Sequence, residues 1–259
     1  MDVKPSINFK PEGLAVLNFA GMILASDEYS TAAINFPGSN CNWFWGTKGD
    51  FFITFNLYQD GVRVGSVSSQ HINEKGYIEL DFDTFARIRG KTYEGMFIAN
   101  FWHSKEIPAE LYLSHFHRAS GSYMAYPAIA FTGDQLYPDV HATQLENTLF
   151  WPGIAENEHT ETSIAIVNPY KVPFSYQAAV YTESGERIQT PIQKVRPFQF
   201  KFHKIQDLFA DRYDEIRGHE GQVSLCVSAQ YKVVTYVVIR NRQSGVITAI
   251  DHLHTYCLY

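Results

Sequence analysis

The chain has 259 residues, of which 45% are hydrophobic and 19% are charged. This composition is typical of a folded protein with a large core and excludes a disordered chain. The 27 acidic side chains exceed the 21 basic ones, and the formal net charge is −6. Proteins that grip phosphate backbones carry a basic surface, so nucleic acid is not expected as a partner.

The N-terminus has no basic region followed by an apolar run, so we expect no secretory signal. The apolar stretch at residues 13–25 is interrupted by Asn18 and Gly21 and is too short to span a bilayer. No membrane insertion is therefore expected. The sparse, odd set of cysteines suggests free thiols in a reducing compartment, hence a cytoplasmic location, with an excised secreted domain as the alternative. These cysteines are Cys41, Cys226 and Cys257.

Alternation of apolar and polar residues predicts strands along most of the chain, for example at 51–57 and 231–239. Asp60-Gly61 and Ser184-Gly185 lie between such segments, and both pairs accept the positive φ that a tight hairpin requires. They predict hairpin turns. Helix is expected only in two short segments, residues 83–88 and 204–213. The fold class predicted from this pattern is all-β.

Six landmarks recur in the same order along the chain, which indicates an internal duplication. The paired landmarks are 18–21 with 130–133, 34–38 with 149–153, 58–61 with 181–185, 78–82 with 198–202, 94–95 with 220–221, and 118–121 with 242–245. The predicted organisation is two similar β-sandwiches in tandem, of jelly-roll or immunoglobulin-like type. The first repeat, with an N-terminal extension, covers residues 1–126, and the second covers residues 127–259.

The second repeat carries a run of apolar strand residues ending in Asn168-Pro169, then an acidic-glycine turn at residues 180–185, then further strands at 221–227 and 233–234. This pattern resembles the small bacterial β-sandwich family of the sensory rhodopsin transducer and, more loosely, immunoglobulin-like modules. The resemblance implies a sandwich fold, oligomerisation through sheets, and a cytoplasmic binding or signalling role instead of catalysis.

Two His-x-His pairs are candidate metal ligands: His115 with His117, and His252 with His254. Residues two apart on a strand project to the same face, so each pair could offer two imidazoles to one transition-metal ion. The alternative is a pair of polar strand ends. The repeat alignment favours that alternative, because it places neither pair opposite the other. Cys257 is a poor third ligand, since alternation puts it on the opposite face.

Tryptophans and neighbouring polar residues form a second candidate site, because large rigid rings bind sugars and other flat ligands. The predicted ligand-binding residues are Asn42, Trp43, Trp45, Trp102, His103 and Trp151. The alternative is that these rings fill the two cores. Trp43 and Trp45 favour a binding role, since they lie in a predicted loop between Gly38 and Gly46.

The sequence has no Gly-x-Ser-x-Gly nucleophile elbow, no phosphate-binding loop, no Gly-x-Gly-x-x-Gly and no Cys-x-x-Cys motif. We therefore expect a non-enzymatic ligand-binding, assembly or signalling protein that needs no cofactor. Its predicted partners are a small molecule, such as a carbohydrate, or a protein, and the chain is expected to form a homo-oligomer. The alternative is a metal-dependent enzyme that uses the His-x-His pairs.

Overall fold

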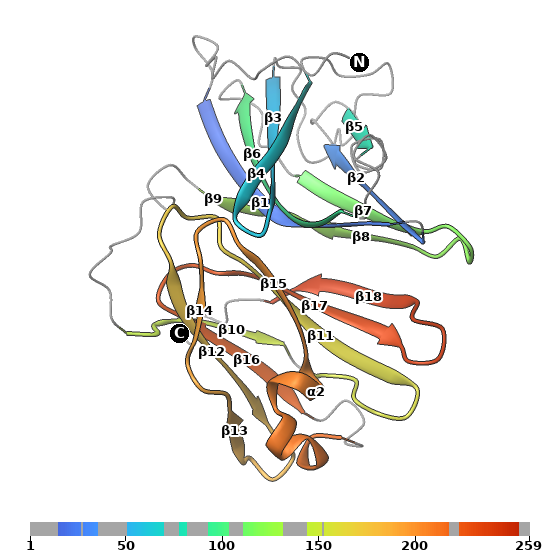
Figure 1. Ribbon diagram of the computed structural model, residues 1–259, viewed down its shortest axis with the longest axis vertical. Helices are drawn as coiled ribbons and strands as arrows, with labels where there is room; N and C mark the ends of the chain where they lie inside the picture. Colours follow the sequence, from blue (N-terminus) through green and yellow to red (C-terminus); the bar gives the residue numbers. More distant parts are fainter. Residues whose placement is uncertain are drawn as a thin grey trace, which may run out of the picture. The chain divides into compact units, whose positions relative to one another are not determined.

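The computed structural model describes residues 15–26, 28–35, 51–69, 78–81, 93–103, 111–131, 144–151, 153–217 and 223–253. These residues form an all-β structure of antiparallel sheets, with short helices in one region only. The chain divides into two units, residues 1–137 and residues 138–259. Figure 1 colours the strands of the first unit blue to green and those of the second yellow-green to red.

The described residues of the first unit form two antiparallel sheets (Figure 1). One has the strand order β4-β3-β6-β1-β9, and the other has the order β5-β2-β7-β8. The strands are β1 (Ala15–Ala25), β2 (Tyr29–Asn35), β3 (Phe51–Gln59), β4 (Val62–Ser69), β5 (Ile78–Asp81), β6 (Tyr93–His103), β7 (Leu111–His117), β8 (Tyr123–Pro127) and β9 (Ile129–Phe131).

In the second unit the described residues also form two antiparallel sheets. One has the order β10-β16-β12-β13, with β14 also paired to β12, and the other has the order β15-β11-β17-β18. Its elements are β10 (Asn147–Trp151), β11 (Thr160–Val167), β12 (Phe174–Tyr181), β13 (Arg187–Gln189), β14 (Gln193–Val195), β15 (Phe200–Lys204), the helix α2 (Ile205–Leu208), the 3-10 helix η2 (Ala210–Glu215), β16 (Ser224–Ala229), β17 (Val234–Asn241) and β18 (Ile247–His252).

Turn chemistry produces the predicted hairpins. Asp60 and Gly61 connect β3 to β4, with φ of 51° and 82°. Gly185 has φ of 79° in the turn between β12 and β13. The helical segment predicted at 204–213 is present as α2 and η2, whereas residues 83–88 lie outside the described residues. No helix in the described part of the chain is long and apolar enough to cross a membrane.

The two sheets of the first unit approach each other closely at Gly21 on β1. A Cβ atom there would lie 2.7 Å from Phe97 Cε1 on β6 and 3.1 Å from Leu113 Cδ1 on β7. Both neighbouring side chains are fully buried, so the space of the missing side chain is already filled. Glycine is needed at this position because the packing leaves no room for a larger residue.

The Asn-Pro motif of the second unit has a structural role. The Asn168 side chain is fully buried, and its amide nitrogen donates to the carbonyls of Val172, Val195 and Arg196 at 2.9, 3.2 and 2.9 Å. Its Oδ1 accepts a hydrogen bond from the Tyr170 backbone at 2.9 Å. One side chain thus satisfies buried backbone groups from two loops, which fixes both loops against the core.

Candidate functional site

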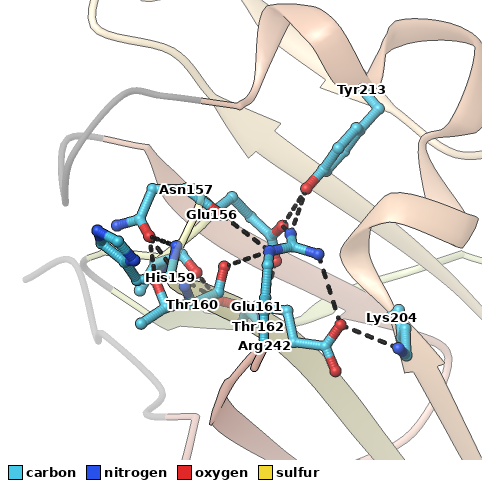
Figure 2. Close-up of polar contacts among 10 residues, drawn as sticks. Glu156, Asn157, His159, Thr160, Glu161, Thr162, Lys204, Tyr213 and Arg242 are labelled. Carbon is cyan, nitrogen blue, oxygen red and sulfur yellow. Dashed lines mark hydrogen bonds and ion pairs between the residues drawn. The ribbon is translucent and has the colours of Figure 1, made fainter. Parts of the chain in front are cut away.

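Figure 2 shows a polar cluster at the start of β11 in the second unit. Its centre is the Glu156 carboxylate, whose side chain is 1% exposed. Arg242, in the turn between β17 and β18, donates from Nη2 to Glu156 Oε2 at 2.8 Å and to the Tyr213 hydroxyl at 2.6 Å. Tyr213 on η2 donates to the same carboxylate oxygen, and the Thr162 backbone donates to Oε1. Both oxygens of this buried carboxylate are therefore hydrogen-bonded.

Arg242 extends the cluster to the neighbouring strands. Its Nε donates to the carbonyls of Asn157 and Thr160, at 2.8 Å each. Its other terminal nitrogen lies 3.6 Å from Glu161, which also pairs with Lys204 of β15 at 2.9 Å. The guanidinium group thus joins the turn before β11, the strand β11 itself and the 3-10 helix.

The local sequence explains why Glu156 lies at this point. Asn157 Oδ1 accepts hydrogen bonds from the backbone nitrogens of His159 and Thr160 at 2.8 and 2.9 Å. This Asx turn reverses the chain immediately before β11. It carries the preceding residue, Glu156, over the end of the sheet, within reach of Arg242.

The 3-10 helix that supplies Tyr213 is held at both ends. Phe209 before it and Ile216 after it are buried. Within it, Arg212 pairs with Glu186, in the turn between β12 and β13, at 2.6 Å, and with Glu215. The phenol is therefore positioned by apolar anchors as well as by its contacts with Glu156 and Arg242.

Burial determines the protonation chemistry of the cluster. It raises the pKa of Glu156 above its ordinary value, against the opposing effects of hydrogen bonds from Tyr213 and Thr162 and the charge of Arg242. Burial and the adjacent carboxylate raise the pKa of Tyr213 to about 12, so the phenol stays a hydrogen-bond donor at neutral pH. Since the carboxylate oxygens and the phenol are already engaged with one another, the arrangement suits positioning of the helix better than proton transfer to a ligand.

No motif in the sequence marks Glu156 or Tyr213 as a member of a site. The only signal was the repeated landmark at residues 118–121 and 242–245, which contains Arg242. Glu156 and Arg242 are 86 residues apart, and no local pattern links them.

The structure places His115 and His117 on one face of β7, as alternation predicts. Both rings contact Tyr29, with centroid separations of 4.6 and 4.9 Å. His115 is fully buried. The Nδ1 of His117 accepts a hydrogen bond from the Ser120 backbone at 3.2 Å and lies 2.7 Å from Ser120 Oγ. The pair is therefore packed against an aromatic ring, with one ring nitrogen already engaged.

The second pair lies in the other unit. His252, on β18, is 3.0 Å from Asp251 through Nδ1, and His254 lies outside the described residues. Within the described ranges, no three or more His, Cys, Asp or Glu side chains come together in a way that could hold a metal ion. Structural zinc sites use four protein ligands and catalytic ones three, whereas each His-x-His pair supplies only two. The hypothesis that these pairs bind a metal ion therefore stays a prediction from sequence.

The predicted aromatic site is only partly described. Asn42, Trp43 and Trp45 lie outside the described residues. Trp102 and His103 end β6, and Trp102 is in register with Val16 on β1 and Phe52 on β3. Trp151 is half-buried at the end of β10, in register with Leu225. The ligand-binding role of these residues stays a prediction.

Comparison with family models finds no match for this chain, and comparison with curated proteins finds none. Among solved structures, a Thermotoga maritima protein, number 1070, is similar with a TM-score of 0.35 and 12% identity, over 42% of this chain and 94% of that one. A Pleurotus ostreatus lectin has a TM-score of 0.21 and 12% identity, over 92% and 75%. Bacteroides uniformis β-glucuronidase 2 has a TM-score of 0.20 and 10% identity, over 90% and 25%. TM-scores this low carry no argument about fold or function.

Proposed function

We propose that the chain is a non-enzymatic binding and assembly protein, built of two fused β-sandwiches and able to self-associate. The observation that carries this proposal is a pair of exposed aromatic side chains on one sheet face of the first unit. Phe116 on β7 and Tyr123 on β8 are directly opposite in the strand register. They are 39% and 57% exposed.

The exposed pair belongs to a larger apolar surface. Ala125 is exposed and shares the face of Tyr123, because it lies two residues further along β8. Among the strands that the structure describes, β8 is also the last one in its sheet. Contiguous apolar residues beside an unpaired strand edge favour contact with another protein, and natural proteins otherwise protect such edges.

The partner we propose for this surface is a second copy of the chain. Two β8 strands related by a two-fold axis would run antiparallel, which is the pairing already used throughout both units. A two-fold contact brings the same patch from each copy together, so Phe116 and Tyr123 of both copies would cover one another. No additional partner surface is needed for this arrangement.

We further propose that the two units arose by duplication and that each forms a sandwich. The sheets β5-β2-β7-β8 and β15-β11-β17-β18 correspond strand by strand: in each, the two central strands are flanked by the strand that lies between them in the chain and by the strand that follows them. The β7–β8 and β17–β18 turns also make equivalent backbone hydrogen bonds. The Arg118 amide donates to the Glu28 carbonyl at 2.9 Å, and the Arg242 amide donates to the His159 carbonyl at 2.8 Å. The glycines of the two turns, Gly121 and Gly245, share a φ of 70°. These parallels support a common origin.

Analytical ultracentrifugation tests the assembly proposal on the full chain. We expect the wild-type protein to self-associate and the double variant Phe116→Ser with Tyr123→Ser to sediment as a monomer with unchanged circular dichroism. Ile192→Ser is the matched control, because Ile192 is also strongly exposed but lies in a loop of the second unit. It should leave association unchanged. A monomeric wild type, or a double variant that associates equally well, would refute the proposal.

A further inference from the structure

The hydrogen bonds between β7 and β8 determine which backbone groups of β8 point to its free edge. In an antiparallel pair, every second residue bonds to the neighbouring strand, and the residues between them point their backbone groups away from it. At one end of this pair the Ala128 amide donates to the Leu111 carbonyl at 2.8 Å. At the other end the His117 amide donates to the Ser122 carbonyl at 2.8 Å. The even-numbered residues of β8 therefore bond to β7.

The odd-numbered residues of β8 point their backbone groups to the free edge. They are Tyr123, Ala125 and Pro127. Tyr123 and Ala125 each present one N–H donor and one carbonyl acceptor, and both residues are exposed. Pro127 has no amide hydrogen and presents only its carbonyl. Since β8 pairs with β7 alone among the described strands, this edge is open over two residues and ends at a proline.

The corresponding edge of the second unit, on β18, is blocked. Its pairing with β17 contains a register shift of the kind a β-bulge makes. The Leu253 amide donates to the Thr235 carbonyl at 2.9 Å, so by alternation the backbone of His252 points away from β17. The His252 amide is already bound there, because it donates to the Asp251 carboxylate at 2.7 Å. Bulges and charged side chains are devices that keep an edge strand from pairing with another chain.

We infer that two copies of the chain join through β8 in a single register, with Tyr123 opposite the partner's Ala125, and that this assembly closes as a dimer. A hydrogen-bonded pair needs outward-pointing groups on both strands. Tyr123 with the partner's Ala125, together with the converse pair, uses every outward donor and acceptor of both residues. The inference rests on the proposed assembly role and specifies how the two copies contact one another.

The two neighbouring registers leave backbone groups unsatisfied. If Ala125 lay opposite the partner's Ala125, Tyr123 would lie opposite the partner's Pro127, which has no N–H to give to the Tyr123 carbonyl. If Tyr123 lay opposite the partner's Tyr123, Ala125 would lie opposite the partner's Gly121. The Gly121 amide already donates to the His117 carbonyl at 3.0 Å within its turn. An edge carbonyl that loses water without gaining a donor weakens the contact.

The side chains also fit the inferred register. Met124 lies on the axis, opposite the partner's Met124, and it is only half-buried in the single chain, so the contact covers more of its apolar surface. On the other face, the Tyr123 ring lies beside the partner's Ala125, whose small side chain leaves room for it. A two-fold contact uses the same strand of both copies. Because β18 is blocked, it offers no second edge for further copies.

Oxidative crosslinking of single-cysteine variants of the full chain tests the register. Cys41 and Cys257 are first changed to serine, and Cys226 is buried. In the inferred register the two Cα atoms of residue 124 lie about 4.5 Å apart, within disulfide range. Those of residue 123, and likewise of residue 125, lie about 7–8 Å apart, which is too far. Met124→Cys should therefore form a disulfide dimer at least about tenfold faster than Tyr123→Cys or Ala125→Cys.

Thr248→Cys is the matched control, because residue 248 is exposed on β18, and it should not crosslink. Sedimentation of each reduced variant sets a concentration at which it is associated. Faster crosslinking of Tyr123→Cys or Ala125→Cys than of Met124→Cys overturns the register. Crosslinking of Thr248→Cys, or wild-type species larger than a dimer, overturns the closed assembly. A monomeric wild type refutes the proposed assembly role itself, whereas an associating wild type whose Met124→Cys variant does not crosslink refutes the register alone.

Discussion

Replacing Arg242 by methionine should destabilise the second unit strongly. Methionine keeps most of the side-chain volume but removes the charge and the donors that face Glu156, Tyr213 and the turn before β11. The Glu156 side chain is 1% exposed, so water cannot replace the lost partner. The carboxyl group is then left buried without its counter-charge.

The expected loss is about 3–5 kcal/mol at neutral pH, the range for removing one partner of a buried ion pair. Because the Arg242 side chain is 25% exposed, we expect the lower part of that range. Burial already raises the pKa of Glu156 with Arg242 present. Without Arg242 the pKa should rise further, and the destabilisation should become smaller in acid as the carboxyl group takes up a proton.

Urea unfolding followed by Trp151 fluorescence measures this loss, since Trp151 is the tryptophan of the second unit. Arg212→Met is the matched control. Arg212 also pairs with two carboxylates, Glu186 and Glu215, but its side chain is 43% exposed, so water and salt screen those pairs. The control should lose far less stability than Arg242→Met.

A double variant makes the reasoning refutable. Changing Glu156 to leucine together with Arg242→Met removes the unpaired carboxyl group, so it should recover a large part of the lost stability. If Arg242→Met costs no more than Arg212→Met, or if the double variant is no more stable than Arg242→Met alone, the buried-charge account is wrong.

Three further predictions concern single buried positions. The pKa of Glu156 is raised in the folded state above the ordinary carboxyl value of 4.5, so near and above pH 4.5 the folded chain binds more protons than the unfolded chain. The free energy of unfolding should therefore fall as the pH rises from 4.5 towards the pKa of the folded state. Glu156→Gln should remove this decline, measured by urea unfolding from pH 4 upward. Asn168→Leu should cost about 3 kcal/mol, because it leaves the buried Val195 carbonyl and the part-buried carbonyls of Val172 and Arg196 without their donor, and the Tyr170 backbone amide without its acceptor; an unchanged urea midpoint would contradict the assigned role of the amide. Gly21→Val should cost about 2 kcal/mol by overpacking against Phe97 and Leu113. A melting temperature equal to that of the wild type would show that these neighbours make room for the larger side chain and would contradict the packing argument.

Local patterns were sufficient to predict the strands and several turns of this chain. Asp60-Gly61 and Gly185 were predicted as turn residues because their preference for positive φ is a property of a few adjacent residues. Alternation likewise predicted that His115 and His117 would share one face of a strand. That both rings would pack against Tyr29 depends on pairing between β2 and β7, which alternation does not specify.

Composition and periodicity therefore determined that this is an all-β chain with hairpin turns at specified glycines, because those preferences act within a few residues. The tertiary structure decided which polar side chains meet. Glu156 reaches Arg242 across 86 residues, and Asn100 reaches Asn18 across 82. Such contacts depend on the order and register of antiparallel strands, where a shift of one residue would turn every side chain to the other face.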